Sequence, residues 1–120
     1  MTEKITRDVI EKLFKNMRKD KSIDVNGPLL WGYFFNDPSV DKLENAIKEL
    51  EALGYEYVGV YSDEDETDFA LHVQKVETHT VDSLIALNEV FYTFAAKHGI
   101  EAYDGMDVGR VENESEDEKA

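Results

Sequence analysis

The chain has 120 residues, 42% of them hydrophobic and 33% charged, a composition typical of one globular domain with a single core. It contains no cysteine, which excludes disulfide bonds, thiolate metal sites and cysteine nucleophiles. The formal net charge of -14 argues against direct binding of nucleic acid, whose phosphates are held by lysine and arginine, and favours a basic protein partner. No apolar run is long enough for a signal peptide or a membrane span, so we expect a cytoplasmic protein without membrane contact.

Residues 1–20 are predicted to form an amphipathic helix. Ile5, Val9, Leu13 and Met17 recur every four residues and form an apolar stripe. A stripe of this kind needs a surface to pack on, so we expect this helix to dock on the main domain. Two positions stay open, an edge of the domain or an exposed sheet face.

The next two elements are a strand and a helix. Residues 29–35, LLWGYFF, are almost continuously apolar, which predicts a strand in the centre of a sheet. Asp37 fits the N-cap of a following helix, and Pro38 fits its first position. Gly54 supplies the left-handed residue that ends this helix.

The second half of the chain predicts two strands, a helix and a last strand. Residues 55–61 and 69–76 are the strands, joined by a charged hairpin. A long helix runs from the cap residue Thr80 to Gly99. Residues 100–104 form a short strand that ends in an Asp-Gly turn, and residues 111–120 form an acidic tail predicted to be disordered.

This order of elements predicts the fold class. After the N-terminal helix it is strand, helix, strand, strand, helix, strand, the βαββαβ order of the ferredoxin-like fold. That fold is an α+β class with an antiparallel four-stranded sheet, and right-handed crossovers place both helices on one face. We therefore expect a ferredoxin-like domain over residues 28–109, with the N-terminal helix as an addition.

Tyrosines of the strand 55–61 suggest a binding face. Tyr55, Tyr57 and Tyr61 alternate with two valines, Val58 and Val60. The valines suit the helix-covered core, so the tyrosines are expected to point outward. His72 and Gln74 of the next strand are expected on the same side.

An outward aromatic face leaves three interpretations open. RNA-recognition modules stack bases on such rings, but residues 69–76 lack a basic-glycine-aromatic run, and the net charge opposes RNA. The N-terminal helix could cover the rings, or the rings could bind a protein, because tyrosine is a favoured interface anchor.

The remaining polar clusters predict no chemistry. The hairpin sequence DEDETD lacks the spacing, central glycine and terminal glutamate of a calcium loop, so a solvated turn is expected. His98 suits the C-terminal end of a helix dipole. No metalloprotease motif and no serine elbow is present. We therefore predict a protein that is not an enzyme and needs no cofactor or metal.

Two segments resemble the RraB family of small acidic bacterial proteins, the inhibitors of ribonuclease E. One runs from Leu43 to Gly54-Tyr55, and the other from Ser83 to Tyr103-Asp104-Gly105. The resemblance implies a ferredoxin-like fold and inhibition of the endoribonuclease RNase E, through its disordered, arginine-rich regulatory region. The family often has tryptophan after Tyr-Asp-Gly, where this chain has Met106.

The leading hypothesis is a regulator that acts by binding a protein, by resemblance RNase E. The predicted partner contacts are Tyr55, Tyr57, Tyr103, Asp104 and Asp107. For Tyr103 and Asp104 a structural role is the alternative, with the ring packed on the last helix and the carboxylate starting a turn. A small-molecule sensor, an acidic immunity or antitoxin-type protein, and a homodimer also remain open.

Overall fold

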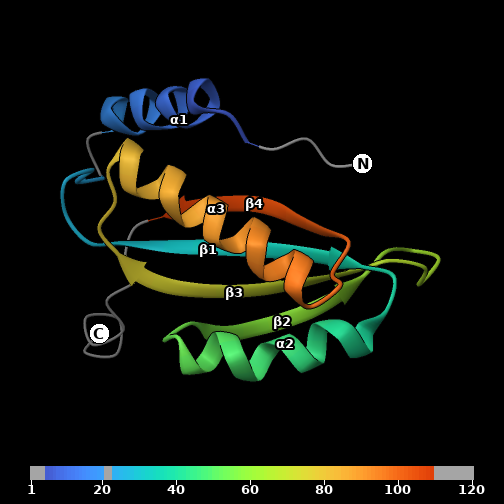
Figure 1. Ribbon diagram of the computed structural model, residues 1–120. Helices are drawn as coiled ribbons and strands as arrows, with labels where there is room; N and C mark the ends of the chain where they lie inside the picture. The colour runs from blue at the N-terminus through green and yellow to red at the C-terminus, as the bar shows by residue number, and fades with distance from the viewer. Residues whose placement is uncertain (1–4, 21–22, 110–120) are drawn as a thin grey trace, which may run out of the picture.

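The computed structural model describes residues 5–20 and 23–109. These contain three helices and a four-stranded antiparallel sheet of order β2-β3-β1-β4, as Figure 1 shows. The elements are α1 (Arg7–Lys19), β1 (Leu29–Asp37), α2 (Val40–Ala52), β2 (Glu56–Ser62), β3 (Phe69–Glu77), α3 (Val81–Lys97) and β4 (Ala102–Gly109). The predicted α+β class and the central position of β1 are confirmed. The predicted tail, residues 111–120, lies outside the described residues, as do residues 1–4 of the predicted first helix.

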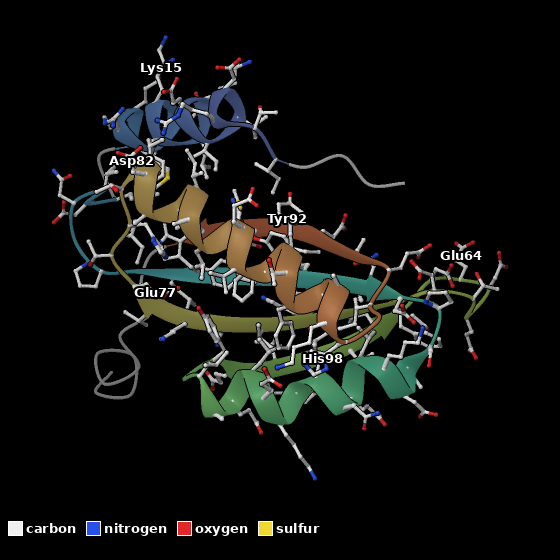
Figure 2. The ribbon with its side chains drawn as sticks, in the orientation of Figure 1. Lys15, Glu64, Glu77, Asp82, Tyr92 and His98 are labelled. Carbon is white, nitrogen blue, oxygen red and sulfur yellow. The ribbon has the colours of Figure 1, made fainter. Side chains whose placement is uncertain are left out.

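All three helices lie on the same face of the sheet (Figure 1). α1 lies beside α3 and buries Ile10, Phe14 and Met17, while Lys15 points away from the domain (Figure 2). The ring of Phe14 stacks on that of Trp31 in β1, with 6.1 Å between the ring centroids. α1 therefore extends the helix layer, and the arrangement in which it covers the opposite face of the sheet is excluded.

The core between sheet and helices is rich in aromatic rings. β1 directs alternate side chains toward the helices because successive residues of a strand face opposite sides. These core residues of β1 are all buried: Leu29, Trp31, Tyr33 and Phe35. The ring of Phe91 in α3 lies 4.9 Å from that of Tyr33 and 5.3 Å from that of Phe35, measured between centroids.

The helix ends follow local sequence signals, except at the starts of α1 and α2. The helix predicted over residues 1–20 starts at Arg7, with Thr6 as its N-cap. Thr80 and Ser83 form a capping box at the start of α3, and Gly54 and Gly99 adopt positive φ after α2 and α3. The predictions that Asp37 caps α2 and that Pro38 takes its first position are both wrong, because the N-cap is Ser39 and the helix begins at Val40.

Asp37 instead holds two elements together from a buried position. Its carboxylate accepts the backbone N–H of Ser39 at 2.7 Å and that of Glu101 at 2.8 Å. It therefore joins the start of α2 to the segment that enters β4. A buried carboxylate is tolerated here because both oxygens accept backbone hydrogen bonds.

Two β-bulges change the predicted faces and ends of the outer strands. In β2 the pairing with β3 shifts between Tyr57 and Gly59, so that Tyr57 pairs with Val73 on the core side. In β4 the pairing with β1 shifts between Gly105 and Tyr103. Gly105 takes a φ of 113°, and the strand continues to Gly109, so the predicted Asp-Gly turn is not a strand end.

A half-buried carboxylate at the end of β3, that of Glu77, predicts a pH-dependent stability that can be tested. The Tyr33 hydroxyl donates to Glu77 Oε2 at 2.7 Å, and His79 Nε2 lies 3.3 Å from the same oxygen. Burial raises the pKa of Glu77, but hydrogen bonds from His79 and Tyr33 outweigh it, and the net pKa is lowered. A carboxyl whose pKa is lowered by folding stabilises the protein above its unfolded pKa, about 4.3, and this stability is lost as the pH falls through the folded value.

We therefore expect acid to destabilise the wild type more than the Glu77→Gln variant. Urea unfolding between pH 7 and pH 3 measures this, with the free energy of unfolding compared at each pH. The wild type should be the more stable at pH 7, and the two curves should converge in acid. Parallel curves for the two proteins would show that Glu77 is not a source of the acid sensitivity.

Candidate functional site

One face of the sheet has no helix over it among the described residues. In β1 and β3, every second side chain points into the core, and the side chains between them point to this uncovered side. The strand register places their partners in β2 and β4 beside them. We call this surface the open face. Its residues are Leu30, Gly32, Phe34, Asn36, Glu56, Gly59, Tyr61, Ala70, His72, Gln74, Val76 and Asp107.

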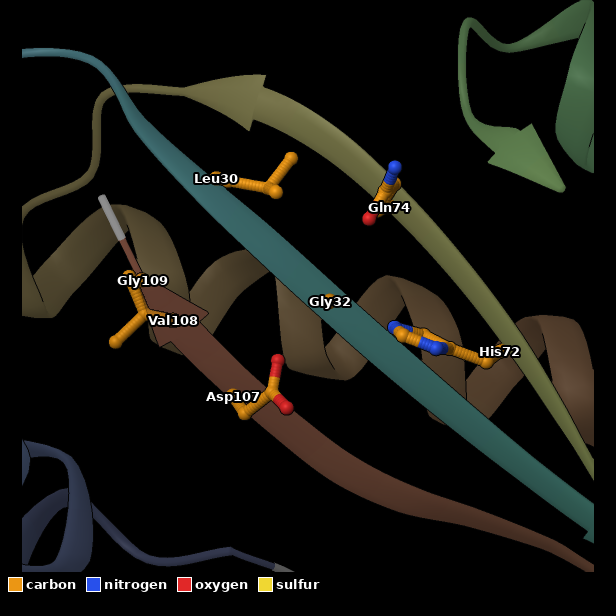
Figure 3. Close-up of a pocket in the computed structure, with 7 residues that line it drawn as sticks. All are labelled: Leu30, Gly32, His72, Gln74, Asp107, Val108 and Gly109. Atoms are coloured by element: carbon orange, nitrogen blue, oxygen red, sulfur yellow. The ribbon is translucent and has the colours of Figure 1, made fainter. Parts of the chain in front are cut away.

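The open face contains a hollow centred on Gly32. Side chains of β1, β3 and β4 surround it, as Figure 3 shows, and its volume is about 340 Å³. We call it the Gly32 hollow. Its lining residues are Leu30, Gly32, His72, Gln74, Asp107, Val108 and Gly109.

The absence of a side chain at Gly32 lets two neighbouring side chains approach the floor of the hollow closely. A Cβ atom at this position would lie 2.6 Å from Asp107 Oδ1 and 2.7 Å from His72 Nε2. Real Cβ atoms essentially never have contacts this short, so the carboxylate and the imidazole both lean over the glycine. A glycine in the middle of a strand often marks such a close approach.

The walls of the hollow combine a carboxylate, an aromatic surface and an amide. The rings of His72 and Phe34 stack with 4.4 Å between centroids and 20° between planes. The Gln74 amide donates to Glu56 Oε1 at 2.9 Å, which fixes a second carboxylate near this side of the sheet. Asp107 is exposed, and no hydrogen bond or ion pair of its carboxylate is found within residues 5–20 and 23–109. None of these residues neutralises its charge.

A second, smaller hollow of about 220 Å³ lies at the hairpin end of the open face, between Asn36, Tyr61 and Asp68 among others. The Asn36 amide donates to Asp68 Oδ2 at 3.4 Å. Asp63 accepts the backbone N–H of Thr67 at 2.8 Å and its hydroxyl at 2.9 Å, and the backbone bond to Thr67 is the main cause of its lowered pKa. The Asp63 carboxylate thus organises the hairpin turn.

The predicted contact residues do not form one surface. Tyr57 is 43% exposed at the β2 edge, and Asp104 is exposed at the β4 bulge on the other edge. Among the predicted contact residues, Asp107 is the one that lines the Gly32 hollow. The prediction that Tyr55 points outward is wrong, since it is 7% exposed and its ring lies 5.7 Å from that of Tyr33. Tyr103, another predicted contact, is only 2% exposed.

The motif residue Tyr103 packs inside the domain. Its ring lies 5.2 Å from Phe91 and 5.3 Å from Phe35, and its hydroxyl donates to Asn88 Oδ1 at 2.5 Å. Burial raises its pKa. Tyr103 lies in β4, and its ring packs on α3. This agrees with the alternative that Tyr103 has a structural role. Tyr55 and Tyr103, the two buried residues among the predicted contacts, therefore offer no surface to a partner.

Two residues of the hollow lie on the side of the sheet that the sequence predicts for them. His72 and Gln74 face away from the core, as predicted. Gly32 was missed as a site residue, although a single glycine inside the aromatic run LLWGYFF was the available signal. Nothing local to Asp107 indicates that it would lie beside residues of β1 and β3.

The fold and its free surface define a small α+β domain with one uncovered, partly acidic sheet face. By sequence, the chain belongs to the RraB family, described as Regulator of ribonuclease activity B, which it matches over residues 5–108. The search of curated proteins found no match. Within the described part of the chain, no helix is both long and apolar enough to cross a membrane.

Proposed function

We propose that this protein is a non-enzymatic regulator that binds and inhibits a ribonuclease, by resemblance RNase E, through its regulatory region. The observation that carries the proposal is membership of a family of regulators of ribonuclease activity over residues 5–108. The net charge of -14 supports it, because an acidic surface attracts an arginine-rich segment and speeds its association. A regulator of RNA decay would act in the cytoplasm, and we include this location in the proposal.

The same proposal assigns the domain to the ferredoxin-like class. Support comes from the order of elements after α1 and from the sheet order, in which β1 and β3 are the central strands. In this arrangement the helices occupy one face, and the open face is a regular surface that no described helix covers. Tyr57, Asp104 and Asp107 remain as proposed contacts from the sequence, because all three are exposed.

An RNA cleavage assay with purified RNase E tests this function. Stoichiometric amounts of the protein should slow cleavage by the full-length enzyme, and a truncated enzyme without the regulatory region should be unaffected. Binding should weaken as salt rises from about 0.05 to 0.5 M, because exposed charges are screened over shorter distances. Equal inhibition of both enzyme forms would contradict action through the regulatory region, and no inhibition of either would contradict the function.

A further inference from the structure

We infer that the Gly32 hollow binds the guanidinium group of an arginine side chain carried by an extended, cationic protein segment. This inference rests on the proposed function and names the contact by which the partner is recognised. The geometry points to it through three features of the hollow: one available carboxylate, one flat aromatic wall and a floor without a side chain.

The carboxylate supplies the charge and the hydrogen-bond acceptors. Asp107 lies on the rim of the hollow, with Oδ1 next to the space above Gly32 (Figure 3). A guanidinium presents parallel N–H donors that match the two oxygens of a carboxylate. Because no described residue neutralises Asp107, a basic side chain entering the hollow would gain this pairing without breaking another.

The aromatic wall favours arginine over lysine. One face of the His72 ring lies against Phe34, and its Nε2 edge reaches over Gly32, so an aromatic ring borders the space in front of Asp107. Guanidinium groups stack on aromatic faces, whereas an ammonium is a compact and strongly hydrated charge. Leu30, on the open face, offers apolar contact for the aliphatic stem of the incoming side chain.

The size of the hollow suits one side chain. Its volume of about 340 Å³ lies at the low end of the range for small-ligand pockets, about 300–1,000 Å³. A phosphate group is disfavoured there, because it would meet the charge of Asp107 and lie near that of Glu56. The occupant we propose is therefore a protein segment with arginine, because the charges around the hollow disfavour nucleic acid.

A peptide titration tests the inference directly. The probes are a labelled synthetic peptide of alternating arginine and serine, and counterparts with lysine or uncharged citrulline in place of arginine. At about 0.15 M salt the wild type should bind the arginine peptide most tightly. In an NMR titration the Gly32 amide and the His72 ring signals should move before those of α2.

Two variants change the hollow in different ways. Asp107→Asn should weaken binding of the arginine peptide about tenfold, the change expected when a charge-assisted contact is lost. Gly32→Ala should weaken it similarly, because the new Cβ would displace the Asp107 carboxylate and the His72 ring. The atoms that this new Cβ would meet are the ends of movable side chains, so Gly32→Ala should still fold. A melting curve for each variant checks this.

Asp41→Asn is the matched control, because it removes the same charge from an exposed residue of α2, on the helix side of the domain. It should change the peptide affinity by less than about twofold, the effect of one screened surface charge. Equal losses in Asp107→Asn and Asp41→Asn, equal binding of the arginine and lysine peptides, or no peptide binding would each overturn the inference. RNase E inhibition that survives in Asp107→Asn would overturn the hollow as the contact and leave the proposed function standing.

Discussion

Replacement of Phe91 by alanine is expected to lower the free energy of unfolding by about 3–5 kcal/mol, the range for removal of a buried aromatic ring. Phe91 is 1% exposed and lies at the centre of the aromatic core. Its ring is within 5.5 Å, centroid to centroid, of four others, those of Tyr33, Phe35, Tyr55 and Tyr103. Alanine would leave a cavity between α3 and the sheet, because the rigid rings around it cannot close the space.

Urea unfolding followed by circular dichroism measures this loss. The matched control is Val90→Ala, on the next residue of the same helix, where the side chain is 54% exposed. It should change stability by less than about 0.5 kcal/mol. Since small domains have total stabilities of about 5–15 kcal/mol, Phe91→Ala should unfold at a clearly lower urea concentration. A loss in Phe91→Ala no larger than in Val90→Ala would contradict the packing of α3 on this core.

Replacement of Tyr103 by alanine is expected to cost about 3–5 kcal/mol as well. The substitution removes a buried ring that packs on Phe35 and Phe91, together with the hydroxyl that donates to Asn88. Tyr103→Phe keeps the ring and removes only the hydroxyl. It should cost about 1–3 kcal/mol, because the buried acceptor Asn88 Oδ1 would lose its partner.

These variants separate structural from binding roles within Tyr103-Asp104-Gly105. Asp104 is exposed in the β4 bulge, so Asp104→Ala should leave the melting temperature nearly unchanged. Tyr103→Phe should lower the melting temperature and leave the affinity of the folded protein for its partner unchanged. A Tyr103→Phe variant of normal stability and weakened binding would mean that this tyrosine contacts the partner, contrary to its burial.

The sequence by itself determined the three helices, the ends of α2 and α3, and the start of α3. Glycine after α2 and α3 takes the left-handed conformation that other residues avoid, and Thr80 caps its own helix. These interactions involve residues a few positions apart, so the local sequence carries them. The apolar run of β1 also determined its central position in the sheet. A strand that is paired on both edges and covered by helices on one face has few side chains in contact with water, so it can be almost continuously apolar.

The tertiary structure decided which way the outer strands face. A bulge adds one residue to one strand, and every side chain before it then points to the opposite side. This is why Tyr55 lies in the core and Val58 is exposed, the reverse of the prediction from alternation. The bulge is set by the pairing of β2 with β3, so no pattern within β2 reveals it.

The candidate site also depended on the tertiary structure. The sequence indicated an acidic, protein-binding domain, because charge and family signature are properties of the chain itself. The Gly32 hollow exists only because β1 pairs with β3 on one side and with β4 on the other. That pairing brings His72 and Asp107 together over Gly32 from distant parts of the chain, and contacts of this range leave no periodic signal in the sequence.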